Sequence, residues 1–259
     1  MANPALDKTF GELPAVTVSA DAALATAAPS PVVSDHDVMT IGGTSAKTGL
    51  LLLLVIGAGA WGWTLVDPEA GTSSIPPALW LVMIGVFVLA IVTAFKPKLA
   101  IITGPIYALS MGVVLGAISH IYDSQFGGIV IQAVMATAAV FIVMLVLFVT
   151  RTIRVTNRMR GIVIGATAGL ALFYLASIVL ALFGVSVPLI WDTGIMGIAF
   201  SVFVVGLAAF NLMLDFDMIE RGVIARSPKY MEWYGAFGLT VTIIWMYIEM
   251  LRLLGKARS

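Results

Sequence analysis

The residues best suited to chemistry in this 259-residue chain are a few charged side chains inside or beside long apolar stretches. Asp215, Asp217 and Glu220 follow one such stretch, and Glu249 and Arg252 lie within the last. Charged side chains are expensive in a lipid-like environment, so those that remain there are candidates for function. Carboxylates at such a depth can take up protons and can supply the hard oxygen ligands that calcium prefers. The chemistry we expect is therefore binding or movement of protons or cations.

Asp215 is the acid whose charge is least explained by nearby residues in the sequence. Asp217 lies four residues before Arg221, and Glu249 lies three residues before Arg252. Residues at these spacings are neighbours on a helix, so each pair can neutralise itself, with the two arginines as accessory residues. Asp215 has no basic residue three or four positions away in either direction. We therefore select Asp215 as the main pH sensor and calcium ligand, with Asp217 and Glu249 as further gate candidates.

Three more polar residues are accessory candidates. Asn211 lies one turn before Asp215, where it can hydrogen-bond the acid or line the same cavity. His120 ends an apolar stretch, and Asp123 lies just beyond it. We interpret these two as polar residues at the outer membrane surface, with a role in cation entry or proton sensing as the alternative.

The composition excludes several other kinds of site. No cysteine is present and there are only two histidines, which excludes disulfides, thiolate sites and multi-histidine metal or haem sites. The metalloprotease motif H-E-x-x-H, the nucleophile motif G-x-S-x-G and the phosphate-binding G-K-S/T loop are all missing. A formal net charge of zero does not favour binding to nucleic acid. We therefore expect neither enzymatic activity nor a tightly bound cofactor.

The same composition predicts the elements that position these residues. Hydrophobic residues make up 60% of the chain and charged residues 11%, far below the roughly 25% of a soluble domain. Seven stretches are long enough to cross a bilayer, which needs about 20 apolar residues per helix. They lie near 49–66, 78–95, 99–121, 128–150, 161–183, 193–214 and 233–254. We predict an all-α, seven-helix membrane domain over 47–259, preceded by a disordered tail over 1–46.

The lysines and arginines predict the orientation of these helices. Eleven of the 14 bases fall on one side, namely Lys8, Lys47, Lys96, Lys98, Arg151, Arg154, Arg158, Arg160, Arg221, Arg226 and Lys229. That side is expected to be the cytoplasm, which also places the N-terminus there. Arg252, Lys256 and Arg258 follow the last helix and fall on the other side. A re-entrant last segment is the alternative that would avoid this conflict.

Two predicted helices carry small residues at four-residue spacing, which lets helix backbones approach closely. The third has Gly104, Ala108, Gly112 and Gly116, and the fifth has Gly161, Gly165 and Gly169. We predict that both ridges are packing seams.

Three segments in order resemble the Bax inhibitor-1/YccA family of seven-helix membrane proteins. They are ITGPIYALSMGVVLGAISHIYDSQFGGIVIQAVMATAAVF, NLMLDFDMIERG and MYIEMLRLLG, and the similarity covers about 49–255. The resemblance implies a bacterial inner-membrane protein that passes calcium in a pH-dependent leak gated by two acids. The acid of the sixth helix maps to Asp215, with Ile219 four residues later. The acid of the seventh maps either to Glu249 or to Thr242, depending on the alignment.

Depth in the membrane distinguishes these two positions. At 1.5 Å per residue, Asp215 lies about 14 Å from the turn that joins the last two helices. Thr242 lies about 16 Å from that turn and Glu249 about 27 Å. Thr242 is therefore expected to be level with Asp215, which leaves Asp217, Asn211 or a displaced Glu249 as polar partners.

Protonation of such an acid can act as a gate. Burial in a low-dielectric bundle favours the neutral carboxyl form, and a second nearby carboxylate favours it further, so titration can move towards neutral pH. Loss of the proton then creates a ligand for calcium. The alternative function is a regulatory membrane protein that binds a membrane protease or another membrane partner. A proton-coupled exporter is a weaker alternative, because no inverted repeat with broken helices is evident.

Overall fold

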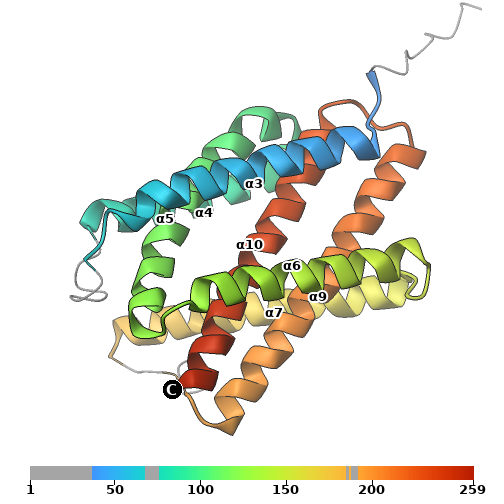
Figure 1. Ribbon diagram of the computed structural model, residues 1–259. Coiled ribbons are helices and arrows are strands. Elements are labelled where there is room, and N and C mark those ends of the chain that lie inside the picture. The colour runs from blue at the N-terminus through green and yellow to red at the C-terminus, as the bar shows by residue number, and fades with distance from the viewer. Residues whose placement is uncertain (1–36, 68–75, 185–186, 188–191) are drawn as a thin grey trace, which may run out of the picture. The chain divides into compact units, whose positions relative to one another are not determined.

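Long apolar segments fold into helices in a membrane because only a helix satisfies its own backbone hydrogen bonds there. A computed structural model describes residues 37–67, 76–184, 187 and 192–259. Within these ranges seven helices are long and apolar enough to cross a membrane, as predicted. They are α3 (Ile41–Trp63), α4 (Pro77–Phe95), α5 (Ala100–Gln125), α6 (Ile129–Val149), α7 (Asn157–Leu182), α9 (Ile195–Ile224) and α10 (Met231–Arg258), shown in Figure 1.

Two helix boundaries differ from those expected. Helix α3 begins at Ile41, where the side chain of Thr40 caps the helix by accepting a hydrogen bond from the Gly43 N–H. The predicted boundary between tail and membrane domain, after residue 46, therefore lies inside a helix, whereas residues 1–36 lie outside the described residues. Helix α9 continues to Ile224 instead of ending near 214. The acids Asp215, Asp217 and Glu220 consequently lie within α9 and not beyond its end.

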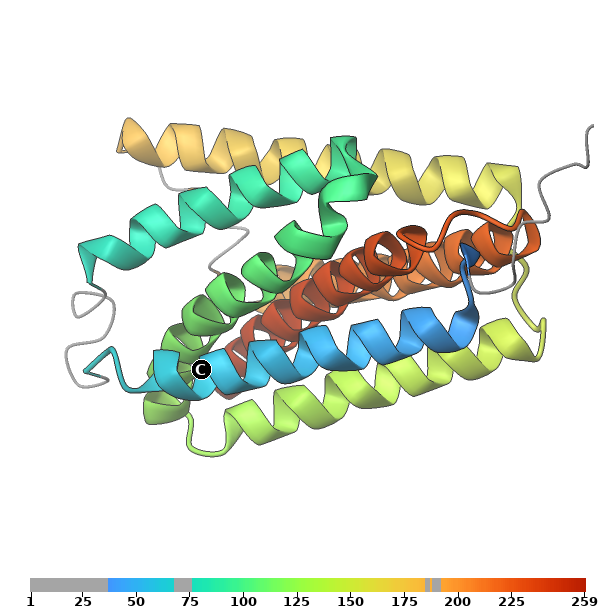
Figure 2. The ribbon, with the colours of Figure 1, turned by 90° about the horizontal axis from the view of Figure 1, so that it is seen from above.

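Helix α10 is the central element of the bundle formed by residues 37–259. It packs against α3, α5, α6 and α9, and Figure 2 shows it running between them. Its first turn contacts Thr40 through Glu232, and at its other end Arg258 donates hydrogen bonds to the carbonyls of Phe126 and Gly127. These contacts lie at opposite ends of the bundle, so α10 crosses it once. The re-entrant alternative for the last segment is therefore wrong.

The two ends of the bundle differ in charge. The basic end contains the start of α3 and the connections 96–99, 150–156 and 225–230, where most lysines and arginines gather. The opposite end contains the α5–α6 turn at 126–128 and the C-terminus.

The predicted ridge of the third helix is a packing seam between α5 and α3. A Cβ atom added to Gly112 would meet the carbonyl oxygen of Val55, and one added to Gly116 would overlap the carbonyl of Gly59. The backbones of the two helices therefore touch, which only glycine permits at these positions.

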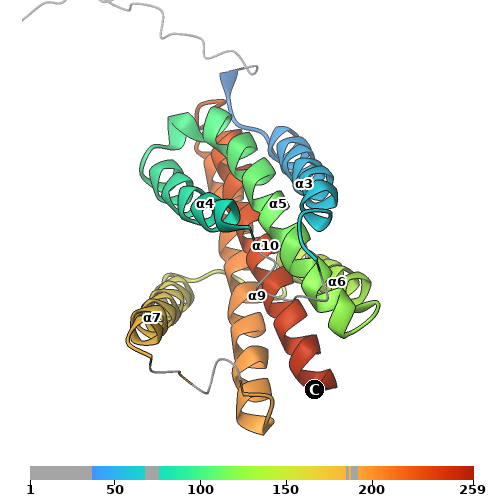
Figure 3. The same cartoon turned by 90° about the vertical axis from the view of Figure 1, so that its left-hand side faces the viewer.

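The second predicted seam, on α7, does not form in the described structure. No atom lies within 4 Å of a Cβ built on Gly161, Gly165 or Gly169. Figure 3 shows α7 set apart from the other helices, and it packs mainly against α9. It does so through a different face, which contains Val163 and Leu170.

Candidate functional site

Asp215 and Thr242 face each other where α9 packs against α10. The Thr242 hydroxyl donates a hydrogen bond to Asp215 Oδ2 over 2.6 Å. The other carboxylate oxygen, Oδ1, lies 3.8 Å from the Cβ position of Gly238, so Gly238 of α10 lies next to the acid as well. Asp215 is half-buried and Thr242 is buried. Among the described residues no basic group pairs with Asp215, whose charge is therefore not balanced by a neighbouring side chain.

This geometry agrees with the depth expected from the sequence. Thr242, and not Glu249, lies opposite Asp215. Glu249 is buried seven residues, or two turns, further along α10, where Arg252 Nη1 donates to its two oxygens over 2.8 and 3.0 Å. The predicted pair on one helix thus forms, and the Tyr174 hydroxyl of α7 also donates to Glu249 over 3.1 Å. Glu249 is neutralised where it lies and does not meet Asp215.

Asp217 is also neutralised and points away from Asp215, towards α7. It pairs with Arg221 over 2.8 Å, as its spacing predicts, and with Arg160 at the start of α7, which the sequence did not indicate. The hydrogen bond expected between Asn211 and Asp215 is not formed, since the Asn211 amide donates to Thr167 on α7 and to a carbonyl of α9.

These contacts define a polar stripe on α7 that sequence reasoning missed. Arg160, Thr167 and Tyr174 are spaced by seven residues and so lie on one face, close to two full turns apart. Each meets a polar side chain of α9 or α10, namely Asp217, Asn211 and Glu249. The signal was present in the sequence, because polar residues in an otherwise apolar membrane helix usually face its neighbours.

Glu232 is a second residue that the sequence did not single out. It is fully buried in the first turn of α10 at the basic end. Its carboxylate pairs with Lys47 of α3 and, over 2.9 Å, with Lys229. It also accepts hydrogen bonds from the N–H and the hydroxyl of Thr40, at 2.9 and 2.7 Å. Because Gly43 has no side chain to displace it, Glu232 ties the start of α3 to the start of α10.

The accessory candidates of the opposite end contact the end of α3 and the α5–α6 turn. The His120 ring stacks on Trp63 with ring centres 4.5 Å apart, and its Nδ1 lies 2.8 Å from the Trp63 carbonyl oxygen. Asp123 accepts a hydrogen bond from the Gly128 N–H in the α5–α6 turn. These two residues hold helix ends together, and among the described residues no hydrogen bond or ion pair joins them to each other or to Asp215.

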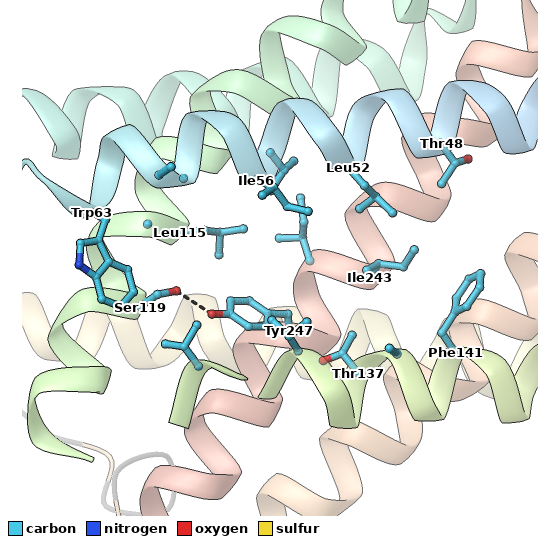
Figure 4. Close-up of a pocket in the computed structure, with 18 residues that line it drawn as sticks. Thr48, Leu52, Ile56, Trp63, Leu115, Ser119, Thr137, Phe141, Ile243 and Tyr247 are labelled. Atoms are coloured by element: carbon cyan, nitrogen blue, oxygen red, sulfur yellow. Dashed lines mark hydrogen bonds between the residues drawn. The ribbon is translucent and has the colours of Figure 1, made fainter. Parts of the chain in front are cut away.

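A cavity of about 730 Å³ lies between α3, α5, α6 and α10, with a mostly apolar lining (Figure 4). Its polar side chains are satisfied, and Ser119 and Tyr247 hydrogen-bond each other over 2.7 Å. Thr242 and Tyr247 lie about 140° apart around α10 at 3.6 residues per turn. The cavity and Asp215 are therefore on different sides of α10, and no acid lines the cavity.

A resident metal centre has no obvious ligand set in the described part of the chain. No group there brings together three or more His, Asp or Glu side chains. Any cation at Asp215 would find only one carboxylate.

Seven apolar helices, whose charged side chains mostly pair inside the bundle, define a seven-helix integral membrane protein. In a comparison with known protein families, residues 3–259 match the family described as Bax inhibitor 1 like. The chain belongs to this family, which confirms the resemblance seen in the sequence. Searches of curated proteins and of solved structures each found no match.

Proposed function

We propose that this protein is a pH-sensitive cation leak channel that prefers calcium, with Asp215 as its sensor. The observation that carries this proposal is the environment of Asp215 on α9. It is a half-buried carboxyl group with a hydroxyl donor, Thr242, and no basic partner among the described residues. A carboxylate in such surroundings is stabilised by a proton or by a cation from solution. Its occupancy therefore depends on both pH and calcium concentration.

The small number of ligands at Asp215 favours passage of an ion over storage. Calcium takes six to eight oxygen ligands, and a resident site supplies most of them from protein. Asp215 and Thr242 offer three side-chain oxygens at most, so a calcium ion here keeps much of its water. Conduction requires binding that is weak enough to release the ion, and a partly hydrated ion meets that condition.

The pH response should be that of one acid and not of a coupled pair. Asp217 and Glu249 are each neutralised by arginines, so neither shares a proton with Asp215. Flux should then rise as Asp215 loses its proton, over a transition with the slope of a single titrating group.

The orientation and location of the protein are part of the same proposal. The basic end should face the cytoplasm of a bacterial inner membrane, because lysines and arginines concentrate on the cytoplasmic side of membrane proteins. The N-terminus is then cytoplasmic, and the C-terminus lies on the outer side. No catalytic step or cofactor is required.

Calcium flux into liposomes that contain only the purified protein, measured between pH 5 and pH 8, tests the proposal. The Asp215→Asn variant should lose the pH-dependent part of the flux. Asp123→Asn is the matched control, because Asp123 only caps the α5–α6 turn, and its pH profile should be unchanged. An Asp215→Asn profile equal to the parent's would reject Asp215 as sensor.

Absence of flux at every pH would reject the channel itself. The remaining function would then be the regulatory one, in which the protein binds a membrane protease or another membrane partner. Co-purification of such a partner from native membranes, together with silent liposomes, is the result that would support it.

A further inference from the structure

A second pocket, of about 420 Å³, lies at the basic end beside the α6–α7 connection. Its lining combines three basic side chains, one acid and three apolar side chains: Arg151, Arg154, Arg221, Asp217, Phe148, Ile153 and Val155. This pocket takes no part in the proposed ion leak. Its mixture of guanidinium groups and apolar side chains suits a ligand that is anionic at one end and apolar at the other.

The charges around this pocket leave a positive excess. Two carboxylates meet four guanidinium groups there: Asp217, Glu220, Arg151, Arg154, Arg160 and Arg221. Arg154 is exposed and makes no ion pair within the described residues. The first turn of α7, which begins at Asn157, contains Arg158 and Arg160 but no acid. Because the helix dipole is positive at that end, these bases are unfavourable there unless an anion lies nearby.

Arg151 is held in place to face the pocket. Its guanidinium group forms two hydrogen bonds with Glu220, one of them at 2.9 Å, and lies 5.4 Å from the centre of the Phe148 ring. The hydrogen bonds and charge of Glu220 raise the pKa of Arg151 above its ordinary value. An arginine is charged at physiological pH in any case, so the contact with Glu220 fixes the position of this cation. Its backbone adopts φ of 58°, the left-handed region where glycine is the usual residue after a helix. An arginine at this position costs backbone energy and places a cation beside the pocket.

The depth of Arg151 and Arg154 in the membrane indicates where an anionic ligand of this pocket would come from. Helix α6 has 21 residues, nearly all of them apolar, and is about 31 Å long, close to the thickness of the hydrocarbon core. Arg151 and Arg154 follow its last residue, Val149, within five positions. They therefore lie in the headgroup layer, where lipid phosphates are the most concentrated anions.

We propose that this pocket binds the phosphate diester of an anionic phospholipid, with Arg151, Arg154 and Arg221 around the phosphate and Phe148, Ile153 and Val155 against the glycerol and first acyl carbons. The excess positive charge selects an anionic headgroup over a zwitterionic one, whose own cation would be repelled. The bound lipid joins the α6–α7 connection to α9, the helix that carries Asp215.

Native mass spectrometry of the detergent-purified protein tests this site. The protein is incubated with equal amounts of phosphatidylglycerol and phosphatidylcholine, and retained lipid is counted. The parent should retain phosphatidylglycerol preferentially. Arg154→Gln should weaken its retention about fivefold, because an arginine near a lipid surface contributes about that factor. Arg154 pairs with no described residue, so this variant should fold; Arg151→Gln should act in the same direction.

Lys96→Gln is the matched control. It removes one charge at the same end of the bundle but in another connection, and it should leave retention unchanged. Equal retention of the two lipids, or equal effects of Arg154→Gln and Lys96→Gln, would overturn the proposal. Displacement of the lipid by millimolar inorganic phosphate would also overturn it, because the pocket would then bind a soluble anion. Lipid retention is measured without ion flux, so its outcome is independent of the proposed channel.

Discussion

Thr242 on α10 donates its hydroxyl hydrogen to Asp215 on α9 across 2.6 Å, at one of the two positions to which the second acid implied by the family resemblance maps. In the proposed gate, an acid and a hydroxyl therefore take the place of two acids. The hydroxyl stabilises the carboxylate, whereas a second carboxylate would repel it.

Restoring a second acid should change the pH response of the flux. In Thr242→Asp two carboxyl groups lie within hydrogen-bonding distance and cannot both ionise freely, so they titrate in two coupled steps. The flux midpoint should move to higher pH in liposomes assayed between pH 5 and pH 8. Thr242→Asn has nearly the same shape but no charge and serves as the control. The same midpoint in both variants would contradict a direct interaction with Asp215.

The contact of Glu232 with the start of α3 should contribute strongly to stability. In Gly43→Ala the new methyl group would overlap the Glu232 carboxylate and displace it from its lysines. We expect a loss of about 1–3 kcal/mol, the usual cost of overpacking. Gly42→Ala is the control, because no atom lies within 4 Å of its Cβ position and alanine favours the helix by up to about 1 kcal/mol. Thermal unfolding in detergent should separate the two variants, and equal melting temperatures would refute the contact.

The glycines of α5 and α7 should respond in opposite ways to the same substitution. Gly116→Ala would force the α5 backbone away from Gly59 and should destabilise the protein by about 1–3 kcal/mol or prevent folding. Gly165→Ala meets open space and should be neutral or stabilising by about 1 kcal/mol. Detergent-solubilised yield and melting temperature measure both effects. A destabilised Gly165→Ala would show that this ridge is covered.

The polar stripe should determine how firmly α7 is attached. Tyr174→Phe removes a hydroxyl group that donates to Glu249 and accepts from Arg252 over 2.8 Å. The loss should be about 2 kcal/mol, since both partners are charged. Ser177→Ala, whose hydroxyl bonds only within α7, should be nearly neutral. Hydrogen exchange of α7 amides should become faster in the first variant and not in the second.

The amino-acid sequence alone was sufficient for the seven membrane-length helices of the described residues and for several relationships along the chain. The length of each apolar stretch predicts a membrane-spanning helix, because lipid offers no hydrogen-bond partners to backbone groups that a helix leaves unpaired. The equal depth of Thr242 and Asp215 in the membrane can be counted from the sequence. Each residue adds a fixed rise along a helix, and both depths are measured from the short turn that joins the two helices. The pairs Asp217–Arg221 and Glu249–Arg252 follow from helical periodicity, and the structure contains both.

Tertiary structure decided which way each helix faces and therefore which polar residues meet. A helix surrounded by both lipid and protein is apolar on all sides, so hydropathy does not determine its rotation about its own axis. For this reason Asn211 was expected beside Asp215 but bonds to Thr167 on α7. The rotation of α7 about its own axis likewise leaves Gly165 exposed and turns Arg160 towards Asp217. The burial of Glu232 depends on three segments, at Thr40, Lys47 and Lys229, that only the folded chain brings together.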